Sequence, residues 1–563
     1  MSAISKNSLT AIITFLNEGI EVENTLKSIR STAGNSVDIL TINDCSTDGF
    51  DYEAAASKYN ARYHKNEERL GIAASRDLGI SMIKTPYFLL LDGHMRFYDN
   101  TWVEKLLCEL EKDDRVLLCC QVKPLSTTNA GNLAEKIENY NEWRSSTWGA
   151  YINFHNSIDG LRADWIVKKE SPNYIELENI PCVLGASYAT NKTYWKYLRG
   201  LEGLKYYGGD EEYISMKVWL EGGRCTLMNN IVVGHLFRKS FPYHTDDVFR
   251  TYNRLWISEL LLPSATRSRV NYYLKKVSIS IYIDAHTMLM DNIVLFKELR
   301  NYYKQIFTQD FSLIKNMNKL YISYVSKSDT LFLDALASLL IQKEDIQKLG
   351  LFYGKMGIYI FLFHYAQYKK NELLLESIQT RFYTYLRQLD IATLSNTFDD
   401  GLWGIGWGLM HLQKQGFIVN IDTLLSNIDE IIMQNTENQL QRLSDYTLKT
   451  GLGGLLFYIF NRIIKYKDKE LDFQNNTDYF SLLYQLTKKA YLSENVYESI
   501  DVFLNFKSYY ESKECLRDDF LNLSDIFLFP DFKGDNIKEW PLGLKNGCAG
   551  VGMCELEKNY GIK

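Results

Sequence analysis

The first 240 residues alternate short apolar runs with stretches of helical periodicity, and this alternation restricts the fold more than any other feature of the sequence. The apolar runs fall at residues 9–15, 38–42 and 87–91, and the amphipathic stretches at 23–31 and 70–83. Continuous apolar runs are typical of strands that are buried on both faces. The pattern therefore predicts a doubly wound, mostly parallel α/β sheet that is covered by helices.

A second pattern begins near residue 340, where the periodicity becomes helical and a Gly-x-x-Gly step recurs. The steps lie at Gly354/Gly357, Gly401/Gly404, Gly451/Gly454 and Gly547/Gly550. Their spacings of 47, 50 and 96 residues, the last close to two units of 48, indicate a helix-pair repeat. We expect each glycine to permit a sharp turn at a helix end, because glycine reaches positive φ without steric cost and lets backbones approach.

These two patterns divide the chain into an α/β domain at residues 1–270 and an all-α domain at 340–563. Residues 271–339 read as helical but carry no motif, and we treat them as a connector.

Composition excludes several classes of protein. Hydrophobic residues make up 46% and charged residues 23%, which is typical of folded domains rather than of long disordered segments. The net charge of −6 gives no general attraction to nucleic acid or to anionic membranes. The start of the sequence lacks a signal-peptide pattern, and no uncharged apolar run reaches the roughly 18 residues of a membrane span. The nine cysteines include no Cys-x-x-Cys pair and read as free thiols, so we expect a cytoplasmic protein.

Polar residues follow the first two predicted strands. Asn17 comes after the run at 12–15, and Asp44 comes after the run at 39–42. Ligands of doubly wound sheets bind beyond the carboxyl ends of the strands, where an amide and a carboxylate can bond a base edge and ribose hydroxyls. Polar loops also follow strands for purely structural reasons, so neither residue alone identifies a site.

The third strand runs directly into Asp92-Gly93-His94, which predicts a metal site. An extended segment puts Asp92 and His94 on the same side of the chain. A mixed oxygen and nitrogen donor set suits Mn²⁺ better than Ca²⁺, and a metal beside a diphosphate neutralises charge on a leaving group. His235 ends another apolar run and is the candidate third ligand, although a buried core histidine is the alternative. Arg238 follows closely and is placed to meet a phosphate.

Five motifs, in this order, resemble those of the polypeptide N-acetylgalactosaminyltransferases. They are Asp44, the segment 71–79 with Arg76, Asp92-Gly93-His94, the segment 207–211 with 218–223, and the segment 233–238. The resemblance continues through Tyr243 and Asn253 to Glu259 and covers about 240 of the 563 residues. The broader family 2 glycosyltransferases share only the first half of these motifs.

The resemblance implies a glycosyltransferase type A fold and a UDP-sugar donor. It implies that Asn17, Asp44 and Arg76 surround the uridine and diphosphate, and that Mn²⁺ or Mg²⁺ is held by Asp92, His94 and His235. It also implies that Arg238 and Tyr243 lie near the phosphates, and that Asp210 stands where the family has a glutamate close to sugar and acceptor.

Glu211 departs from that family, which has an asparagine at this position. The Asp210-Glu211 pair instead resembles the acidic pair of inverting family 2 enzymes, whose second carboxylate is the general base. Such a base accepts the proton of the acceptor hydroxyl, which asparagine cannot do. Retention and inversion of the sugar's configuration therefore both stay open. A salt bridge from Glu211 to Lys217 or Lys205 on a solvated face is the non-catalytic alternative.

The helical half resembles, more loosely, the lanthionine synthetase C-like family, an α/α toroid whose inner helices begin at glycine-rich segments. The closest matches are residues 401–408 and 547–550. The catalytic zinc of that family needs two cysteines and a histidine, and only Cys548 lies near such a motif. We therefore expect an incomplete or cyclisation-inactive toroid that serves binding or shape, and stoichiometric zinc would argue instead for a cyclase.

The sequence as a whole predicts a hexosyl- or N-acetylhexosaminyl-transferase with Asp210, Glu211 and Arg238 as candidate catalytic residues. We expect this enzyme to move a sugar from a UDP-sugar to a hydroxyl or thiol on a peptide. A saccharide acceptor is one alternative. The other is a non-catalytic scaffold for peptide maturation, which the presence of all three proposed metal ligands disfavours.

Overall fold

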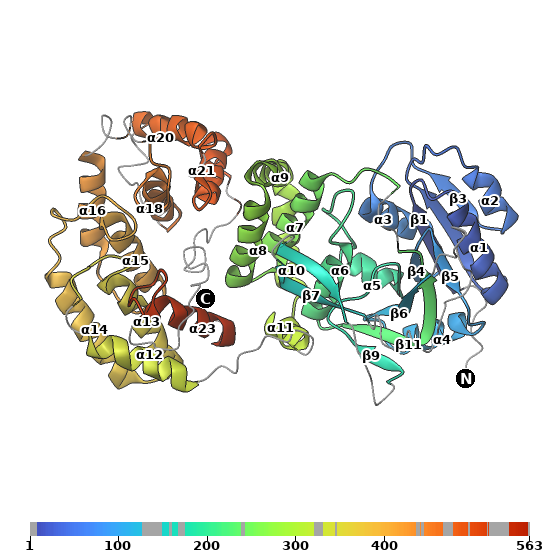
Figure 1. Cartoon of the computed structure of the whole chain (residues 1–563), viewed down its shortest axis with the longest axis horizontal. Coiled ribbons are helices and arrows are strands. Elements are labelled where there is room, and N and C mark those ends of the chain that lie inside the picture. The colour runs from blue at the N-terminus through green and yellow to red at the C-terminus, as the bar shows by residue number, and fades with distance from the viewer. Residues whose placement is uncertain are drawn as a thin grey trace. The chain divides into compact units, whose positions relative to one another are not determined.

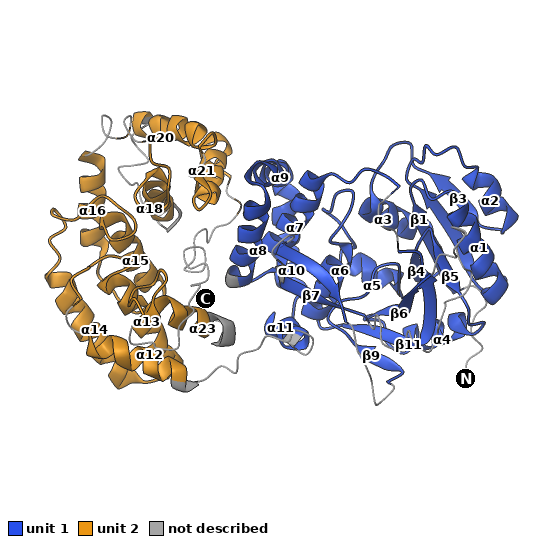
Figure 2. Cartoon of the chain, viewed as in Figure 1, with its two compact units in different colours: residues 1–325 blue, residues 326–563 orange. Residues whose placement is uncertain are grey.

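The computed structural model describes residues 8–125, 149–156, 160–166, 175–237, 242–319, 330–343, 346–434, 440, 444–465, 477–493, 496–514, 516 and 540–560. The chain forms two compact units, Met1–Val325 and Ser326–Lys563 (Figure 2).

A nine-stranded sheet forms the centre of the first unit (Figure 1). Its strand order is β3-β2-β1-β4-β10-β6-β11-β5, with β9 paired to β11. The bounds are β1 Leu9–Phe15, β2 Asp38–Asn43, β3 Arg62–Lys65, β4 Tyr87–Asp92, β5 Met95–Phe97, β6 Val116–Pro124, β9 Leu177–Asn179, β10 Ser187–Asn191 and β11 Arg224–His235. A separate hairpin pairs β7, Ala150–Asn156, with β8, Gly160–Trp165.

The sheet is mixed but mostly parallel. β1 runs parallel to β2 and β4, β2 to β3, and β6 to β11. β10 lies antiparallel between β4 and β6, so β6 and β11 point in the same direction as β1 to β4. All seven residues of β1 are buried, because helices cover both faces of the sheet. The predicted doubly wound, mostly parallel α/β fold is confirmed.

Helices of the first unit continue well beyond the predicted boundary at residue 270. Those up to that boundary are α1 Ile20–Ala33, α2 Tyr52–Lys58, α3 Ile72–Met82, α4 Trp102–Leu110, α5 Lys192–Tyr197, α6 Asp210–Glu221 and α7 Asp247–Leu261, with α8 Ser264–Val277 crossing it. They are followed by α9 Ile279–Asp291, α10 Ile293–Ile306 and α11 Ser312–Lys319. No single described helix has both the length and the apolar composition to cross a membrane, whereas α9 and α10 meet that test together as a pair bent by 75°.

The segment that the sequence indicated as a connector, 271–339, is in fact divided between the two units. Trp256 of α7 is fully buried, and its ring lies 5.5 Å from that of Phe296 on α10. The side chain of Asn318 on α11 accepts a hydrogen bond of 3.0 Å from the backbone N–H of Ile152 in β7. The helices up to Lys319 therefore complete the core of the first unit, and α12, Thr330–Gln342, belongs to the second.

The second unit is all helical in its described residues, as predicted. Besides α12 it contains α13 Lys355–Tyr368, α14 Glu372–Arg387, α15 Leu402–Lys414, α16 Asp422–Gln434, α18 Leu452–Lys465, α20 Thr477–Ala490, α21 Ile500–Ser512 and α23 Cys548–Tyr560. The four Gly-x-x-Gly steps lie at the starts of α13, α15, α18 and α23.

Each glycine step lies where the preceding loop folds back over the start of its helix. The first backbone N–H of each helix donates to the carbonyl seven residues earlier: Lys355 to Lys348, Leu402 to Ser395, Leu452 to Asp445 and Cys548 to Pro541. A Cβ on the second glycine of a step would lie 1.8 to 2.4 Å from the carbonyl oxygen six residues earlier. The expected close approach of backbones is therefore present. The expected positive φ is wrong, because φ is −121° at Gly354 and −112° at Gly401.

A fifth helix start occupies the 96-residue gap between the third and fourth glycine steps. α21 begins at Ile500, and Ser499 takes the position that glycine holds in the other repeats. The Ser499 hydroxyl donates to the carbonyl of Tyr446 at 2.6 Å, which ties this loop to the one before α18. The Lys545 N–H in the last repeat donates to the carbonyl of Phe352 in the first at 3.0 Å. The series of repeats thus returns to its start, where α13 packs against α23.

Candidate functional site

One cavity of about 460 Å³ lies at the carboxyl ends of the parallel strands of the first unit. Its lining comes from segments that are far apart in the sequence. Among them are Thr14 near the end of β1, Asp92 at the end of β4, Asp210 at the start of α6, and His235 at the end of β11. Ligands of such sheets bind at this edge. The cavity is therefore the candidate active site.

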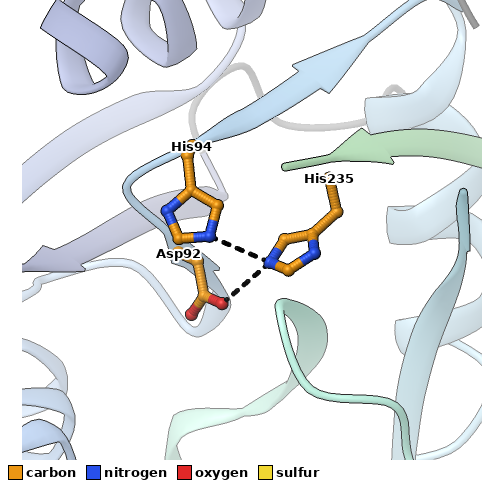
Figure 3. Close-up of side chains that lie close together, drawn as sticks. All are labelled: Asp92, His94 and His235. Atoms are coloured by element: carbon orange, nitrogen blue, oxygen red, sulfur yellow. Dashed lines mark hydrogen bonds and ion pairs between the residues drawn. The ribbon is translucent and has the colours of Figure 1, made fainter. Parts of the chain in front are cut away.

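Asp92, His94 and His235 meet in this cavity (Figure 3). One ligand atom from each lies within 4.8 Å of the others, and among the described residues this is the only such group of three or more histidine, cysteine or acidic side chains. The Nε2 atoms of His94 and His235 are 3.0 Å apart, and Nε2 of His235 is 3.4 Å from Oδ2 of Asp92. Antiparallel pairing of β11 with β5 puts His235 opposite Met95, next to the turn that carries the other two.

The charge states of this cluster suit a divalent cation. Burial alone would raise the pKa of Asp92, but the hydrogen bond to His235 and the charge of Arg76 outweigh it and hold that pKa below the ordinary value. Burial lowers the pKa of His235, which keeps its imidazole neutral near pH 7. Cis positions on an octahedral ion with ligand distances of about 2.1 Å are about 3 Å apart, close to the spacing of the two Nε2 atoms. One carboxylate and two imidazole nitrogens thus fit Mn²⁺ or Mg²⁺.

Arg76 is the centre of a buried cluster of acidic groups beside the metal-binding side chains. The arginine is 2% exposed, and it contacts Asp210, the hydroxyl of Tyr188 at 2.9 Å, Oδ1 of Asp92 at 3.0 Å and Oε1 of Glu211 at 3.4 Å. The resemblance implied a place for Arg76 around the uridine and diphosphate. Arg76 lines the cavity, and its contacts link it to a candidate metal ligand and to both residues of the acidic pair.

The start of α6 presents the acidic pair to the cavity. Gly209 adopts a left-handed conformation with φ of 88° and precedes Asp210, so the carboxylates lie in the first turn, where the helix dipole favours negative charge. Burial and the neighbouring charge of Asp210 raise the pKa of Glu211 well above its usual value. Lys217 is buried and donates to the carbonyls of Leu198 and Gly200. The ion pair considered for Glu211 is therefore made with Arg76 and not with Lys217.

Asp44 lines the cavity, but donors from the protein already occupy its carboxylate. Oδ1 accepts from Asn66, from the backbone N–H of Leu70 and from Ser75, and Oδ2 accepts from the backbone N–H of Gly71. The carboxylate thus holds the loop before α3 in place. A direct contact to a ribose or base has to use the accepting capacity that remains on Oδ2.

Asn17, the other residue predicted for the uridine, is absent from the cavity lining described here. Its side-chain oxygen accepts the backbone N–H of Thr47 at 2.8 Å, and its own N–H donates to Ser46 at 2.9 Å. It therefore ties the loop after β1 to the loop after β2. Arg238 lies outside the described residues.

Several cavity residues were missed by the sequence interpretation. Arg69 lies between the rings of Tyr206 and Tyr243, 5.4 and 5.3 Å from their centroids, and donates to the carbonyl of His244. Tyr243, which was predicted, is thus in the cavity together with a cation. Arg69 belongs to none of the motifs. The only feature of the sequence that pointed to it was its position shortly before Gly71, where the segment 71–79 begins.

Two exposed aromatic side chains also line the cavity. Trp165 of β8 and Phe237 are 40% and 38% exposed, and their rings lie 4.7 Å apart. Phe237 contacts the ring of His235 edge-on at 4.3 Å. The pair forms an apolar surface next to the metal-binding side chains.

In the second unit, Cys548 is the first residue of α23 and is buried. Burial raises the pKa of its thiol to about 11. The thiol is therefore protonated near neutral pH.

Comparison with known proteins yields two family matches. Residues 10–157 match the family described as glycosyl transferase family 2, and residues 310–497 match that described as lanthionine synthetase C-like protein. Both resemblances inferred from the motifs are thereby confirmed, and the chain combines a glycosyl transferase family 2 domain with a lanthionine synthetase C-like region.

Two curated relatives align with about two fifths of this chain. Human polypeptide N-acetylgalactosaminyltransferase 14 is 25% identical over 238 residues, 41% of each chain. Polypeptide N-acetylgalactosaminyltransferase 3 of Drosophila melanogaster is 24% identical over 247 residues, 42% of this chain and 36% of the relative. The chain thus spans about two fifths of the length of these relatives. A crystal structure of GalNAc-T7 with UDP, GalNAc and Mn²⁺ aligns at 18% identity over 56% of this chain and 57% of that one, with a TM-score of 0.42.

Proposed function

We propose that the first unit transfers a sugar from a UDP-sugar to a hydroxyl or thiol of a peptide in a metal-dependent reaction. The observation that carries the proposal is that Asp92, His94 and His235 share one cavity with the acidic pair Asp210 and Glu211.

The charge of the cavity supports a role for a cation in donor binding. Around Arg76 the acidic side chains outnumber the guanidinium, since Asp92, Asp210 and Glu211 all contact it. An anionic diphosphate is repelled from such a surface until a cation offsets the excess charge. A divalent ion held by Asp92, His94 and His235 would supply this charge and stabilise the diphosphate as it leaves.

Protein groups would complete the binding of the diphosphate. Arg69, fixed between the Tyr206 and Tyr243 rings, brings a cation that is always charged to the same cavity. Its planar guanidinium suits contact with phosphate oxygens. Arg76 is already engaged by carboxylates, so its role is to hold Asp92 and Asp210 in position.

In this proposal the sugar and the acceptor meet beside the acidic pair. Gly185 leaves room for Glu211, because a Cβ there would lie 2.5 Å from Oε1 of the glutamate. Burial and the charge of Asp210 raise the pKa of Glu211 above its usual value. The segments 207–209 and 233–238 resemble the polypeptide N-acetylgalactosaminyltransferases more fully than the acidic pair resembles the inverting family 2 enzymes. We therefore propose retention of configuration, in which an oxygen of the leaving phosphate takes the proton of the acceptor.

Two observations support a peptide acceptor. The curated relatives named above are polypeptide N-acetylgalactosaminyltransferases, and the same chain carries a lanthionine synthetase C-like region. The Trp165 and Phe237 rings offer an apolar surface on which a peptide side chain can pack beside the reaction centre.

The test is a screen of UDP-sugars for donor hydrolysis, with Mn²⁺ and with a chelator, followed by mass spectrometry of peptide and glycan acceptors. We expect UDP release that depends on the metal and a mass increase of one hexose or N-acetylhexosamine on peptide. Transfer to glycans alone would favour a saccharide-extending enzyme. The absence of UDP binding in calorimetry, with and without Mn²⁺, would favour a non-catalytic scaffold.

A further inference from the structure

Glu18 is a buried carboxylate directly behind one of the metal-binding histidines. Its side chain is 6% exposed, and Oε2 lies 3.0 Å from Nδ1 of His94. The opposite nitrogen of the same ring, Nε2, faces Nε2 of His235 at 3.0 Å (Figure 3). The imidazole is therefore contacted on its two nitrogens by groups of different kinds.

This contact determines which nitrogen of His94 carries the proton. A carboxylate accepts hydrogen bonds, whereas a neutral imidazole has one N–H donor and one acceptor nitrogen. With Nδ1–H donated to Glu18, the lone pair of Nε2 is left free toward the ligand position. A carboxylate behind a ligating histidine fixes its tautomer and ring orientation and raises its basicity as a ligand.

The segment before α1 and the metal-binding turn approach closely enough to bring these two side chains together. A Cβ on Gly93 would lie 2.9 Å from Cβ of Phe15 and 3.0 Å from Cγ of Glu18, so only glycine lets the turn approach this closely. The hydroxyl of Thr25 on α1 contacts the carbonyl of Gly93 at 2.9 Å and accepts the N–H of Met95 at 2.9 Å. The middle residue of Asp92-Gly93-His94 thus serves the contact to Glu18.

His235 has no comparable support in the described part of the chain. Its Nδ1 is buried and has no hydrogen-bond partner among the described residues, while its Nε2 faces Asp92 and His94. Of the two histidines, His94 is therefore the one whose ring is oriented from behind by a carboxylate.

We propose that Glu18 is a positioning residue that holds His94 in the Nδ1–H tautomer, with its Nε2 lone pair directed at a divalent cation. The inference rests on the proposed function, because it takes Asp92, His94 and His235 as the ligands. Loss of a carboxylate behind a ligating histidine typically weakens metal affinity about 10- to 100-fold.

The experiment measures Mn²⁺ affinity by calorimetry on the full chain without donor or acceptor. Glu18→Leu keeps much of the side-chain volume but has no acceptor, and we expect its Kd for Mn²⁺ to rise about 10- to 100-fold. Glu18→Gln retains an acceptor oxygen for Nδ1–H but loses the charge, and we expect a rise of less than about tenfold. Glu23→Ala is the matched control, since Glu23 lies in the first turn of α1, shortly after Glu18, and pairs with Lys58 at 2.6 Å outside the cavity.

Nitrogen NMR of ring-labelled histidine provides a second readout that a general loss of stability does not produce. We expect His94, assigned by comparison with His94→Ala, to show the Nδ1–H form in the wild type and in Glu18→Gln. In Glu18→Leu the population should shift toward Nε2–H. Thermal melts identify the folded variants, and if Glu18→Leu does not fold, Glu18→Ser replaces it, because serine is too short to reach the ring.

The outcomes separate the two proposals. A wild-type chain that binds no Mn²⁺ would overturn the metal-dependent function and this inference together. A wild-type chain that binds Mn²⁺, combined with a folded Glu18→Leu or Glu18→Ser variant of equal affinity and unchanged tautomer, would overturn only the role of Glu18. Equal weakening in Glu23→Ala would also overturn it, because the effect would then not depend on the contact to His94.

Discussion

At the scale of single residues, His94 and His235 are the sharpest test of metal dependence. Their side chains are 13% and 12% exposed and line a cavity, so replacing either by alanine leaves the sheet packing intact. We expect each change to remove most of the turnover and most of the Mn²⁺ affinity, because each deletes one of three ligands. Initial rates of UDP release and calorimetric titration measure the two effects.

His64→Ala is the control for these histidine variants. His64 lies on the edge strand β3 of the same sheet and is not part of the described cavity lining, so its removal should leave turnover unchanged. Near-normal turnover of His94→Ala, or of the wild type in excess chelator, would contradict a metal-dependent reaction.

Glu211→Gln separates the two stereochemical courses. General-base help is typically worth about 10² to 10⁴ in rate, so an inverting enzyme should lose at least about a hundredfold in turnover. In a retaining reaction an oxygen of the leaving phosphate takes the proton of the acceptor, so Glu211 is not needed as a base. We therefore expect a loss of less than about tenfold, together with a product that keeps the anomeric configuration of the donor, as read by proton NMR.

The matched variant for this comparison is Asp210→Asn. Asp210 contacts the buried Arg76, and neutralising it leaves that guanidinium short of a charged partner. Removing one partner of a buried ion pair costs about 3 to 5 kcal/mol, so Asp210→Asn should lower stability far more than Glu211→Gln does. A loss above about a hundredfold in Glu211→Gln, with UDP affinity unchanged and a product of inverted configuration, would establish Glu211 as the base.

The sequence allowed the site to be predicted wherever a residue directly follows a strand. Asp92 and His235 end β4 and β11, and the carboxyl ends of parallel strands meet at one edge of a sheet. Side-chain direction within a loop was not predictable in this way. Asn17 has a φ of 55°, which turns its side chain toward the loop after β2 and leaves Glu18 facing the metal-binding turn. The sequence showed adjacent polar residues but not which one faces the cavity.

Contacts between elements that are distant in the sequence could also not be predicted. Arg76 lies on α3, and its partners Asp92, Tyr188 and Asp210 come from β4, β10 and α6. Their meeting depends on strand order, because β10 lies antiparallel between β4 and β6. A reversed strand in a mostly parallel sheet has no local signature.

At the scale of elements, the glycine steps of the second unit predict unequal effects of alanine at the two ends of α15. A Cβ at Gly404 would lie 1.9 Å from the carbonyl oxygen of Phe398, a backbone atom that cannot move without disturbing the loop. We expect Gly404→Ala to destabilise the unit by about 3 kcal/mol or more. Urea unfolding followed by far-ultraviolet circular dichroism measures the change.

Gly416→Ala is the control at the other end of that helix. No atom lies within 4 Å of a Cβ there, and only the φ of 77° opposes a side chain. A left-handed alanine costs about 1 to 2 kcal/mol, so this variant should be clearly more stable than Gly404→Ala. Equal losses in the two variants would show that backbone conformation, and not the close approach of the loop, explains the glycine repeat.

The α13–α15 pair also predicts a dependence of stability on pH. Nε2 of His364 lies 2.9 Å from Nε2 of His411, and burial lowers the pKa of His364 from 6.5 to about 4. Between these values the unfolded chain binds more protons than the folded one. The stabilising contribution of neutral His364 is therefore complete above pH 6.5 and is lost as pH drops toward 4. The difference between these two pKa values corresponds to at most about 3 to 4 kcal/mol.

His364→Leu tests this origin of the pH dependence. Leucine fills the site without a titratable group, so the slope of unfolding free energy against pH should flatten between pH 4 and 6.5, whatever the absolute stability. Urea unfolding of the full chain over this range provides the slopes. An unchanged slope would assign the acid sensitivity to other groups.

The periodicity of the sequence was sufficient to predict the main elements of both units but not every repeat. Strands and glycine steps carry strong local signals, and both were found where expected. The repeat at α21 was hidden because Ser499 replaces glycine, and its loop is held by a side-chain hydrogen bond to Tyr446. A substitution of this kind preserves the structure while removing the pattern.

At the scale of the whole molecule, the unit boundary at Val325 determines where the chain can be cut. Every described residue of the cavity lies between Thr14 and Arg254, so the second unit contributes none of them. The helices after residue 270 nevertheless cover core residues: Tyr303 accepts from the buried Lys217, and Phe296 packs on Trp256. The site and the stability of its unit thus depend on different stretches of the chain.

We therefore expect a fragment of residues 1–325 to fold and to bind UDP with Mn²⁺ as the full chain does, whereas a fragment of 1–270 should fail to fold. The shorter fragment exposes Trp256, which is fully buried, and removes a partner of the buried ammonium of Lys217. Circular dichroism melts and calorimetry with UDP compare the two fragments with the full chain. A stable 1–270 fragment would restore the boundary predicted from the sequence. A folded 1–325 fragment that binds no UDP, beside a full chain that does, would mean that the donor site needs the helical unit.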